Sequence, residues 1–493
     1  MNSRIRQLDK SKSPFSSSVP TVRTVDAGGS FAGLRRTYQF EARLLGSGEV
    51  HSFSVQTHST SSPYLAGIFV LAALCLAPAP KAEAAIENVI AISVDGLRGD
   101  YLQTIIETTP ASFPNLIRLR NSSAFTYKAR CDFDYSETIP NHLSMITGKP
   151  VNFVTGLTTS QYTGFTSNLT SGDTASTTVH TYTAAFGTNS GPYKASIFDM
   201  VHDRGMTTAV LLGKARLIIV DRSYDATNGA PDVTGVNNTN DKIDFAQIQN
   251  GITSSLVTTL TTQIAGTSLW RYTFLHVTDP DTAGHASGWS TTVSGAYWNS
   301  IAALDGYLGS IFAALDAKPA LAGKYAIILT ADHGGGGGSL TAHTNATLVE
   351  NYTIPFFLLA PGVPANSDLY AMFDNRFTPG TTRPTMLSTA PPIRNADIAN
   401  LSAELVGVPP VTNSVYLPSL KKPVTVATDG SGNPTVNWPI YLTGWTLESC
   451  DDLAVATPVW TTVTTGITES ATQKTHTVSP SPAARFFRLK GPQ

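Results

Sequence analysis

Four short apolar runs constrain the fold of this chain more than any other feature. They are Asn88–Val94, Thr207–Leu212, Tyr272–Val277 and Tyr325–Thr330. Segments with helical spacing lie between and after them, among them Ile197–Arg204, Tyr297–Leu315 and Asp397–Val406. Strands that alternate with helices predict an α/β fold with a mostly parallel central sheet flanked by helices.

Three of these runs lead directly into residues that can bind a metal ion. These residues are, in chain order, Asp95, Asp281 with His285, and Asp332 with His333. The carboxyl ends of parallel strands meet at one edge of a sheet, where the sites of such folds form. A further imidazole, His343, follows the glycine run Gly334–Gly338. Carboxylates and imidazoles suit Zn²⁺ and similar ions, so the sequence predicts a metal centre at this edge.

The stretch Tyr135–Gly148 supplies a candidate nucleophile. Thr138 stands at the expected start of a helix, Pro140 suits its first turn and Gly148 suits its end. A helix N-terminus presents free N–H groups and partial positive charge, so an anionic group can bind there. A threonine at such a position is more often only a helix cap, and for the stretch on its own this alternative stays open.

The order of the motifs along the chain resembles one superfamily. Val94–Gly96 (VDG) is followed by Glu137–His142 (ETIPNH), Pro280–His285 (PDTAGH), Ala331–Gly334 (ADHG) and the downstream His343. This order resembles the alkaline phosphatase superfamily, and within it most closely the nucleotide pyrophosphatase/phosphodiesterase branch. The resemblance covers the chain from about residue 88 to residue 410.

The resemblance implies two divalent metal ions, expected to be Zn²⁺. One ion would be held by Asp281, His285 and His343. The second would be held by Asp95, Asp332 and His333, and would also touch the oxygen of Thr138. Asn141 would donate a hydrogen bond to a phosphate oxygen. Two such ions can clamp the attacking and leaving oxygens of an in-line displacement.

The implied activity is the hydrolysis of phosphodiester or nucleotide pyrophosphate bonds in small-molecule phosphate esters, through a covalent phosphothreonine at Thr138. A phosphomonoesterase on the same site is the alternative, because Lys214 and Arg216 after a strand could contact a phosphate dianion. A sulfatase is excluded, since the chain has no CxPxR-type motif. An inactive relic that serves as a surface binding protein is the alternative from another class, although all six ligands are present.

The composition argues against a nucleic-acid partner. The net charge is −2, with 33 Lys and Arg against 35 Asp and Glu, so the sequence shows no excess of basic residues of the kind that binds nucleic acid.

Residues 1–85 are expected to be a leader with a signal peptide, in which residues 1–63 are either disordered or not part of the working protein. The apolar core of the signal peptide, residues 65–77, is short for a membrane span and is followed by Ala82-Glu83-Ala84, a small-x-small cleavage pattern. A secreted or periplasmic protein with no stable membrane span after cleavage is therefore expected. A long polar stretch precedes this core, so we also expect the true translation start to lie downstream of Met1. A membrane anchor or a buried segment is the alternative.

Residues 86–418 are expected to form the alkaline phosphatase-like catalytic domain. Residues 151–193, rich in Thr, Ser and Gly, would be either a cap over the substrate pocket or a plain surface insertion. Residues 421–493 show short alternating runs between turn signals, which predict a small β-sandwich-like accessory module. The sequence leaves open whether Cys131 and Cys450 form a disulfide.

Overall fold

The computed structural model describes residues 35–43, 50–58, 86–181, 192–229, 239–451, 457–470, 472–478 and 485–491. The chain divides into two units, Met1–Lys81 and Ala82–Gln493. In the first unit, β1 (Arg35–Arg43) pairs with β2 (Val50–His58) in antiparallel fashion. Disorder, one of the two alternatives for residues 1–63, is therefore wrong for these two segments. The apolar core and the cleavage pattern of the predicted signal peptide lie outside the described residues.

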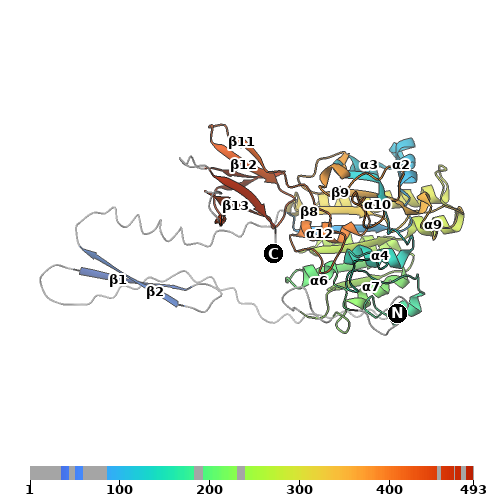
Figure 1. Ribbon diagram of the computed structural model, residues 1–493, viewed down its shortest axis with the longest axis horizontal. Helices are drawn as coiled ribbons and strands as arrows, with labels where there is room; N and C mark the ends of the chain where they lie inside the picture. The colour runs from blue at the N-terminus through green and yellow to red at the C-terminus, as the bar shows by residue number, and fades with distance from the viewer. Residues whose placement is uncertain are drawn as a thin grey trace. The chain divides into compact units, whose positions relative to one another are not determined.

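The second unit is built on an eight-stranded sheet, drawn from blue to orange in Figure 1. Its strands are β3 (Asn88–Val94), β4 (Ala124–Arg130), β5 (Thr208–Leu212), β6 (Phe245–Ile248), β7 (Tyr272–Val277), β8 (Tyr325–Thr330), β9 (Thr353–Leu359) and β10 (Ser367–Asp368). Their order in the sheet is β10-β4-β9-β8-β3-β7-β5-β6, and only β9 runs antiparallel to its neighbours. The predicted mostly parallel sheet is confirmed.

Helices pack in two sets around this sheet (Figure 1). One set contains α2 (Gly99–Thr108), α3 (Pro114–Ser122), α8 (Thr253–Ala265), α9 (Asp279–Ser287) and α10 (Ala296–Asp316). The other contains α4 (Thr138–Thr147), α6 (Ile197–His202) and α12 (Asp397–Val406). The central strands are buried along their whole length, as their continuous apolar runs require.

Shorter helices lie in the connections. They are α5 (Ser171–Thr174), α7 (Ile218–Ser223) and α11 (Val349–Tyr352).

Helix α9 positions two of the candidate metal ligands. It begins at Asp279, two residues after the end of β7. Pro280 fits its first turn, where no intrahelical N–H is needed. Asp281 and His285, four residues apart, therefore share one helix face.

The C-terminal residues form two small antiparallel sheets, as their alternating pattern predicted. One contains β11 (Thr425–Thr428), β12 (Pro434–Pro439), β16 (Gln473–Thr477) and β15 (Ile467–Glu469). The other contains β14 (Thr461–Thr462), β13 (Thr446–Cys450) and β17 (Phe486–Lys490). Of the two cysteines whose pairing the sequence left open, Cys131 is a free thiol.

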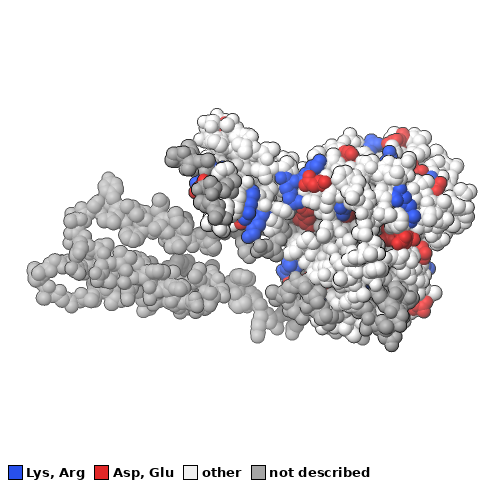
Figure 2. Space-filling view, viewed as in Figure 1, with Lys and Arg blue, Asp and Glu red and all other residues white. Residues whose placement is uncertain are grey.

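Figure 2 shows a lightly charged face on which Lys and Arg alternate with Asp and Glu over a mostly uncharged surface. Within the described ranges, no helix combines the length and the apolar character that a membrane crossing needs.

Candidate active site

The candidate metal ligands come together in two groups at the carboxyl edge of the sheet. We call Asp95, Asp332 and His333 the buried group, because all three are shielded from solvent. We call Asp281, His285 and His343 the open group, because the His285 side chain is 49% exposed. Within each group the ligand atoms lie within 4.8 Å of one another.

The buried group sits on the ends of two neighbouring strands. Asp95 follows β3, and Asp332 and His333 are the second and third residues after β8. His333 Nε2 lies 3.5 Å from Asp95 Oδ1 and 3.3 Å from Asp332 Oδ2.

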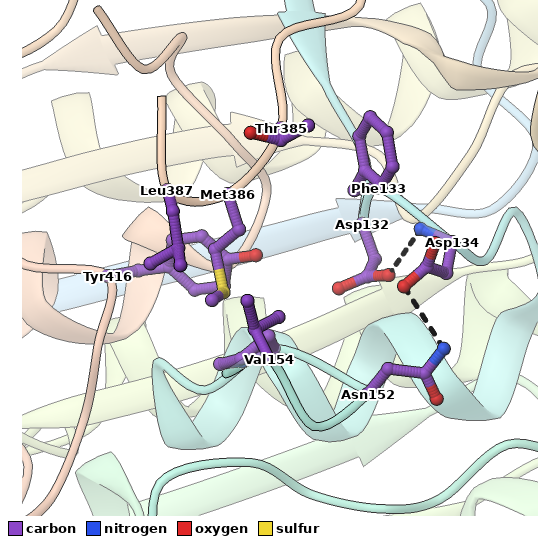
Figure 3. Close-up of a pocket in the computed structure, with 10 residues that line it drawn as sticks. Asp132, Phe133, Asp134, Asn152, Val154, Thr385, Met386, Leu387 and Tyr416 are labelled. Carbon is purple, nitrogen blue, oxygen red and sulfur yellow. Dashed lines mark hydrogen bonds between the residues drawn. The ribbon is translucent and has the colours of Figure 1, made fainter. Parts of the chain in front are cut away.

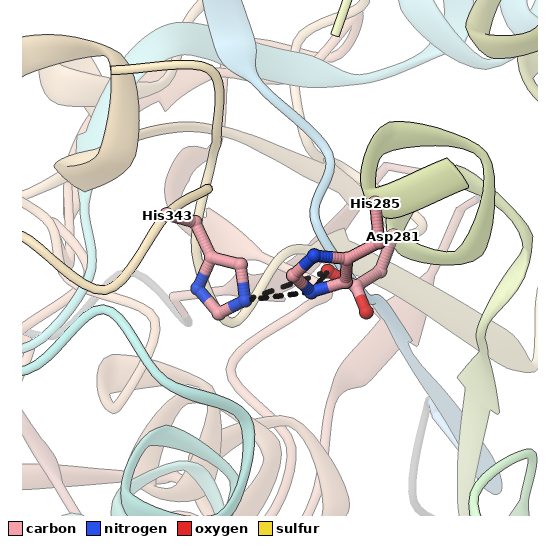
Figure 4. A group of neighbouring side chains, drawn as sticks. All are labelled: Asp281, His285 and His343. Carbon is pink, nitrogen blue, oxygen red and sulfur yellow. Dashed lines mark hydrogen bonds and ion pairs between the residues drawn. The ribbon is translucent and has the colours of Figure 1, made fainter. Parts of the chain in front are cut away.

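The open group combines helix α9 with the loop that follows the glycine run, and its three side chains converge in Figure 4. Asp281 Oδ1 lies 3.4 Å from His285 Nε2 and 3.7 Å from His343 Nε2. Gly96 allows the two groups to approach, because a Cβ at this position would lie 2.9 Å from the Asp281 Cα.

All three histidines present an imidazole lone pair to their group. Each Nδ1 lies within hydrogen-bond distance of a backbone carbonyl: Gly334 O at 2.8 Å for His333, Ser136 O at 2.6 Å for His343, and Thr341 O at 2.9 Å for His285. A carbonyl can only accept, so each Nδ1 carries the proton and each Nε2 is a free acceptor. This arrangement, with Nδ1–H fixed by a carbonyl, is typical of metal-ligating histidines.

The two lone pairs of the open group point at each other. His285 Nε2 and His343 Nε2 are 3.1 Å apart, although neither carries a proton in this tautomer. Two acceptors at that distance repel each other unless a cation lies between them.

Like the histidines, each of the three carboxylates has one polar atom bound by the protein and one that is free. Asp332 Oδ1 accepts from the N–H groups of Gly96 and His333, whereas Asp332 Oδ2 is buried without a partner among the described residues. Asp95 Oδ1 and Asp281 Oδ1 are likewise buried and unpartnered. Buried polar atoms are rarely left unsatisfied, so these atoms and the free imidazole lone pairs fit two divalent cations.

The charges of the site support the same conclusion. Burial, together with the charge of Asp95, raises the pKa of Asp332 well above its usual range. Burial and the neighbouring His333 lower the pKa of His343 to about 2, so this ligand stays neutral. Cations at the two groups would relieve the repulsion between the buried carboxylates.

Lys214 lies between the two groups. Burial would lower the pKa of its ammonium, but Asp95 and Asp281 raise it above its ordinary value. Lys214 Nζ is 2.8 Å from Asp95 Oδ2 and 2.6 Å from Asp281 Oδ2. The predicted contact of Lys214 with a phosphate therefore competes with two ion pairs inside the protein.

Thr138 begins helix α4, as expected, and the segment around it is tied to both groups. His142, one turn later, has its Nδ1 2.7 Å from Thr138 O and 3.6 Å from Asp332 Oδ2 of the buried group. Ser136, two residues earlier, accepts from His343 Nδ1 of the open group. These contacts hold the candidate nucleophile between a ligand of each group.

The predicted role of Asn141 conflicts with its surroundings. Its side chain is fully buried, and its Nδ2 donates to Tyr135 O and Glu137 O, both at 3.0 Å. Its Oδ1 accepts from the N–H of Asp132 and from Asn395 Nδ2. Both amide hydrogens are used to fold the loop before α4, so Asn141 has none left for a phosphate.

Asn168 is a site residue that the sequence did not reveal. Its Oδ1 accepts from the N–H of Ile139, the residue next to Thr138, at 3.1 Å. Its Nδ2 has no hydrogen-bond partner among the described residues. Asn168 lies in the Thr- and Ser-rich segment 151–193, whose weak periodicity gave no signal to single it out.

Trp289 is a second residue that the sequence did not reveal. It is 1% exposed and donates from Nε1 to Gly96 O at 2.8 Å. A Cβ at Gly284 or at Gly335 would lie 2.5 or 2.1 Å from its ring. The glycine run thus provides room for an indole that packs against His285 and His343 of the open group.

The loop before α4 also lines a cavity of about 270 Å³ (Figure 3). Asp132, Phe133 and Asp134 form one side of it. Asn152 and Val154 belong to the segment 151–193 and line it as well. The start of this segment therefore packs beside the loop that carries Thr138.

The α/β fold thus brings two groups of candidate metal ligands together at one edge of its sheet. The family model for type I phosphodiesterase / nucleotide pyrophosphatase matches residues 89–355, more than half of the chain. The chain belongs to this family and is a phosphoric ester hydrolase.

Similar solved structures are distant in sequence. An inactive variant of murine ectonucleotide pyrophosphatase/phosphodiesterase 5 in complex with AMP is 12% identical, covers 68% of this chain and 100% of its own, and has a TM-score of 0.41. A protein of the alkaline phosphatase superfamily from Vibrio parahaemolyticus is 12% identical, covers 72% of this chain and 76% of its own, and has a TM-score of 0.41. Among curated proteins, none matches the chain.

Proposed function

We propose that this protein hydrolyses phosphodiester or nucleotide pyrophosphate bonds with two metal ions and a covalent intermediate on Thr138. The observation that carries the proposal is the set of free ligand atoms. Each of the six ligand residues has one polar atom bound by the protein and one directed into its group. The start of α4 is tied to a ligand of each group.

Thr138 Oγ1 would form the new bond to phosphorus while the bond from phosphorus to the leaving oxygen breaks and the hydroxyl proton passes to solvent. Water then cleaves the phosphothreonine and regenerates the hydroxyl. If Zn²⁺ or a similar ion were held by each group, its positive charge would lower the pKa of the hydroxyl and of the leaving alcohol. Such activation is needed because an unactivated threonine is a poor nucleophile.

Asn168 is our proposed phosphate donor in place of Asn141. Its Oδ1 accepts from the N–H of Ile139, the residue after Thr138, and its Nδ2 has no partner among the described residues. A donor held in place before the reaction stabilises charge on a phosphoryl oxygen without a reorganisation cost. This assignment also gives the segment 151–193 the role of a cap that contributes to the substrate site.

We place diesters ahead of monoesters. The monoester alternative depended on Lys214 and Arg216 as extra cationic contacts to a dianion. Lys214 is engaged by Asp95 and Asp281 instead, and its side chain is 18% exposed. The dianion of a monoester would therefore gain less from Lys214 than the sequence suggested.

The test compares two substrates with zinc-loaded protein, bis-p-nitrophenyl phosphate and p-nitrophenyl phosphate. We expect a higher kcat/KM for the diester. A clear preference for the monoester would overturn the diesterase assignment, and no turnover of either substrate by metal-bound protein would favour the inactive relic.

The nucleophile is tested separately with Thr138→Ala. We expect turnover to fall to background while folding and zinc content stay close to those of the parent, because six other ligands hold the ions. Retained activity in this variant would refute Thr138 as the nucleophile.

We also propose export, on the basis of the apolar core at residues 65–77 and the small-x-small pattern Ala82-Glu83-Ala84. N-terminal sequencing of protein recovered outside the cytoplasm should find a start near Ala85. An intact Met1 would contradict the proposal.

A further inference from the structure

Among the described residues, Lys214 is the one side chain that contacts both ligand groups through their carboxylates. Its Nζ lies 2.8 Å from Oδ2 of Asp95, in the buried group, and 2.6 Å from Oδ2 of Asp281, in the open group. In both residues the other oxygen, Oδ1, is the buried atom without a partner among the described residues. In each of the two carboxylates, the same ammonium therefore holds the oxygen that is not directed into the group.

The remaining ligands do not depend on Lys214, because backbone groups hold them. Asp332 is held by two backbone N–H groups, and the three histidines are held by backbone carbonyls. Asp281 differs: among the described residues, Lys214 is the only hydrogen-bond donor to its Oδ2. Asp95 Oδ2 has a second partner, His276 Nε2 at 3.0 Å.

The sheet fixes Lys214 in this place. Lys214 comes two residues after β5, whose neighbour in the sheet is β7, which in turn pairs with β3. The N–H of Gly213 donates to His276 Nδ1 at 3.1 Å, so His276 carries its proton on Nε2 and donates to Asp95. The His276 imidazole thus links the backbone of Gly213, next to Lys214, to the Asp95 carboxylate that Lys214 contacts.

We infer that Lys214 is a positioning residue that orients one carboxylate of each group, so that the binding of both metal ions depends on this one side chain. Groups that hydrogen-bond to ligating residues fix their orientation, and their loss costs about 10- to 100-fold in metal affinity or activity. The inference rests on the proposed function only in assuming that the two groups bind metal ions.

The test is zinc affinity, measured by titration calorimetry with a competing chelator, together with metal content after dialysis. We expect Lys214→Met to weaken the binding of both ions by about 10- to 100-fold. Lys214→Arg should lose less, since a guanidinium can also bridge two carboxylates. Arg216→Met is the matched control: it removes the same charge two residues away, and its zinc affinity should equal that of the parent.

A second readout separates this role from direct substrate contact. With zinc at saturation, inhibition by inorganic phosphate should be nearly the same in Lys214→Met and in the parent. Weakened phosphate inhibition with unchanged zinc affinity would overturn the inference, and so would weaker binding of only one ion. If Lys214→Met does not fold, the same criteria apply to Lys214→Arg, where a loss confined to one ion contradicts the inference. Zinc affinity does not depend on turnover, so a failure of the proposed activity would be seen separately.

Discussion

The two ligand groups lie side by side but are built differently. The buried group stands on the ends of β3 and β8, the central strands of the sheet, and none of its side chains reaches solvent. The open group stands on helix α9 and on the loop after the glycine run, and its His285 is half exposed. Pairing of neighbouring strands therefore positions the first group, whereas a helix and a loop that pack against Trp289 position the second.

The difference suggests that the two groups would bind their ions with different exposure to solvent. In the buried group, charges act without water, so each missing ligand has a large electrostatic cost. In the open group, a ligand faces solvent, so an ion can exchange there and a substrate can approach. Four experiments test this difference between the two groups.

The largest effect is expected for Asp332→Asn in the buried group. The amide oxygen can still accept from Gly96 and His333, so the fold should persist, but the free carboxylate oxygen is lost. We expect loss of the buried ion and a fall in kcat/KM of about three orders of magnitude or more, since a metal ion supplies several kcal/mol of charge stabilisation. Asp279→Asn, which removes a carboxylate that accepts from Thr253 and Tyr307, is the control and should keep both ions.

Trp289→Ala tests whether side-chain packing holds the open group. The substitution should lower the free energy of unfolding by about 3–5 kcal/mol, as large cavities do in cores. It should also weaken zinc binding at the open group alone, as seen in denaturant unfolding and zinc titration. Trp298→Ala, which removes an indole packed on Phe113, should destabilise the protein without changing zinc affinity. Equal zinc loss in both variants would contradict the supporting role of Trp289.

His285→Ala removes the exposed ligand of the open group. We expect zinc affinity to fall by about 10- to 100-fold and activity to return at raised zinc concentration, because solvent can fill the vacated position. His333→Ala in the buried group should not be rescued in this way. Activity measured across a zinc series would show the contrast, and equal rescue of both variants would remove the distinction between the groups.

His180 is a buried histidine outside both ligand groups, so it can be compared with the three candidate ligand histidines. Its Nδ1 accepts from the N–H of Lys194, and its Nε2 donates to Ser223 O, so neither nitrogen is free. Burial lowers its pKa to about 4. Between pH 7 and pH 5 only the unfolded chain binds a proton here, so this residue alone should cost roughly 2 kcal/mol of stability over that range.

The check on His180 is denaturant unfolding of the parent and of His180→Gln at both pH values. The stability of the variant should fall less between pH 7 and pH 5 than that of the parent. An equal fall in both proteins would show that His180 does not contribute to the pH dependence.

Much of the candidate site could be predicted from the sequence, because several of its candidate ligands follow strands that can be recognised as apolar runs. Asp95, Asp332 and His333 occupy strand ends, and a parallel sheet brings such ends together whatever the helices do. The fold class followed from the same runs. Strands β4, β6, β9 and β10 of this sheet were not predicted, and nothing in the sequence of β9 marks its antiparallel direction.

The rest depended on contacts between distant segments. Asn141 adjoins the nucleophile in sequence, yet it turns back to hold the loop before α4. Asn168 reaches the same helix from a segment of low periodicity. Lys214 was noticed for its charge, but its partners could be known only once β5, β7 and β3 were neighbours. Trp289 carried no signal, because its role depends on two glycines in different segments.

Anomalous diffraction from crystals of the protein grown with zinc tests the two proposed metal sites most directly. We predict two zinc peaks, one at the free atoms of Asp95, Asp332 and His333, and one at those of Asp281, His285 and His343. A single peak, or peaks away from these two groups, would contradict the two-metal proposal.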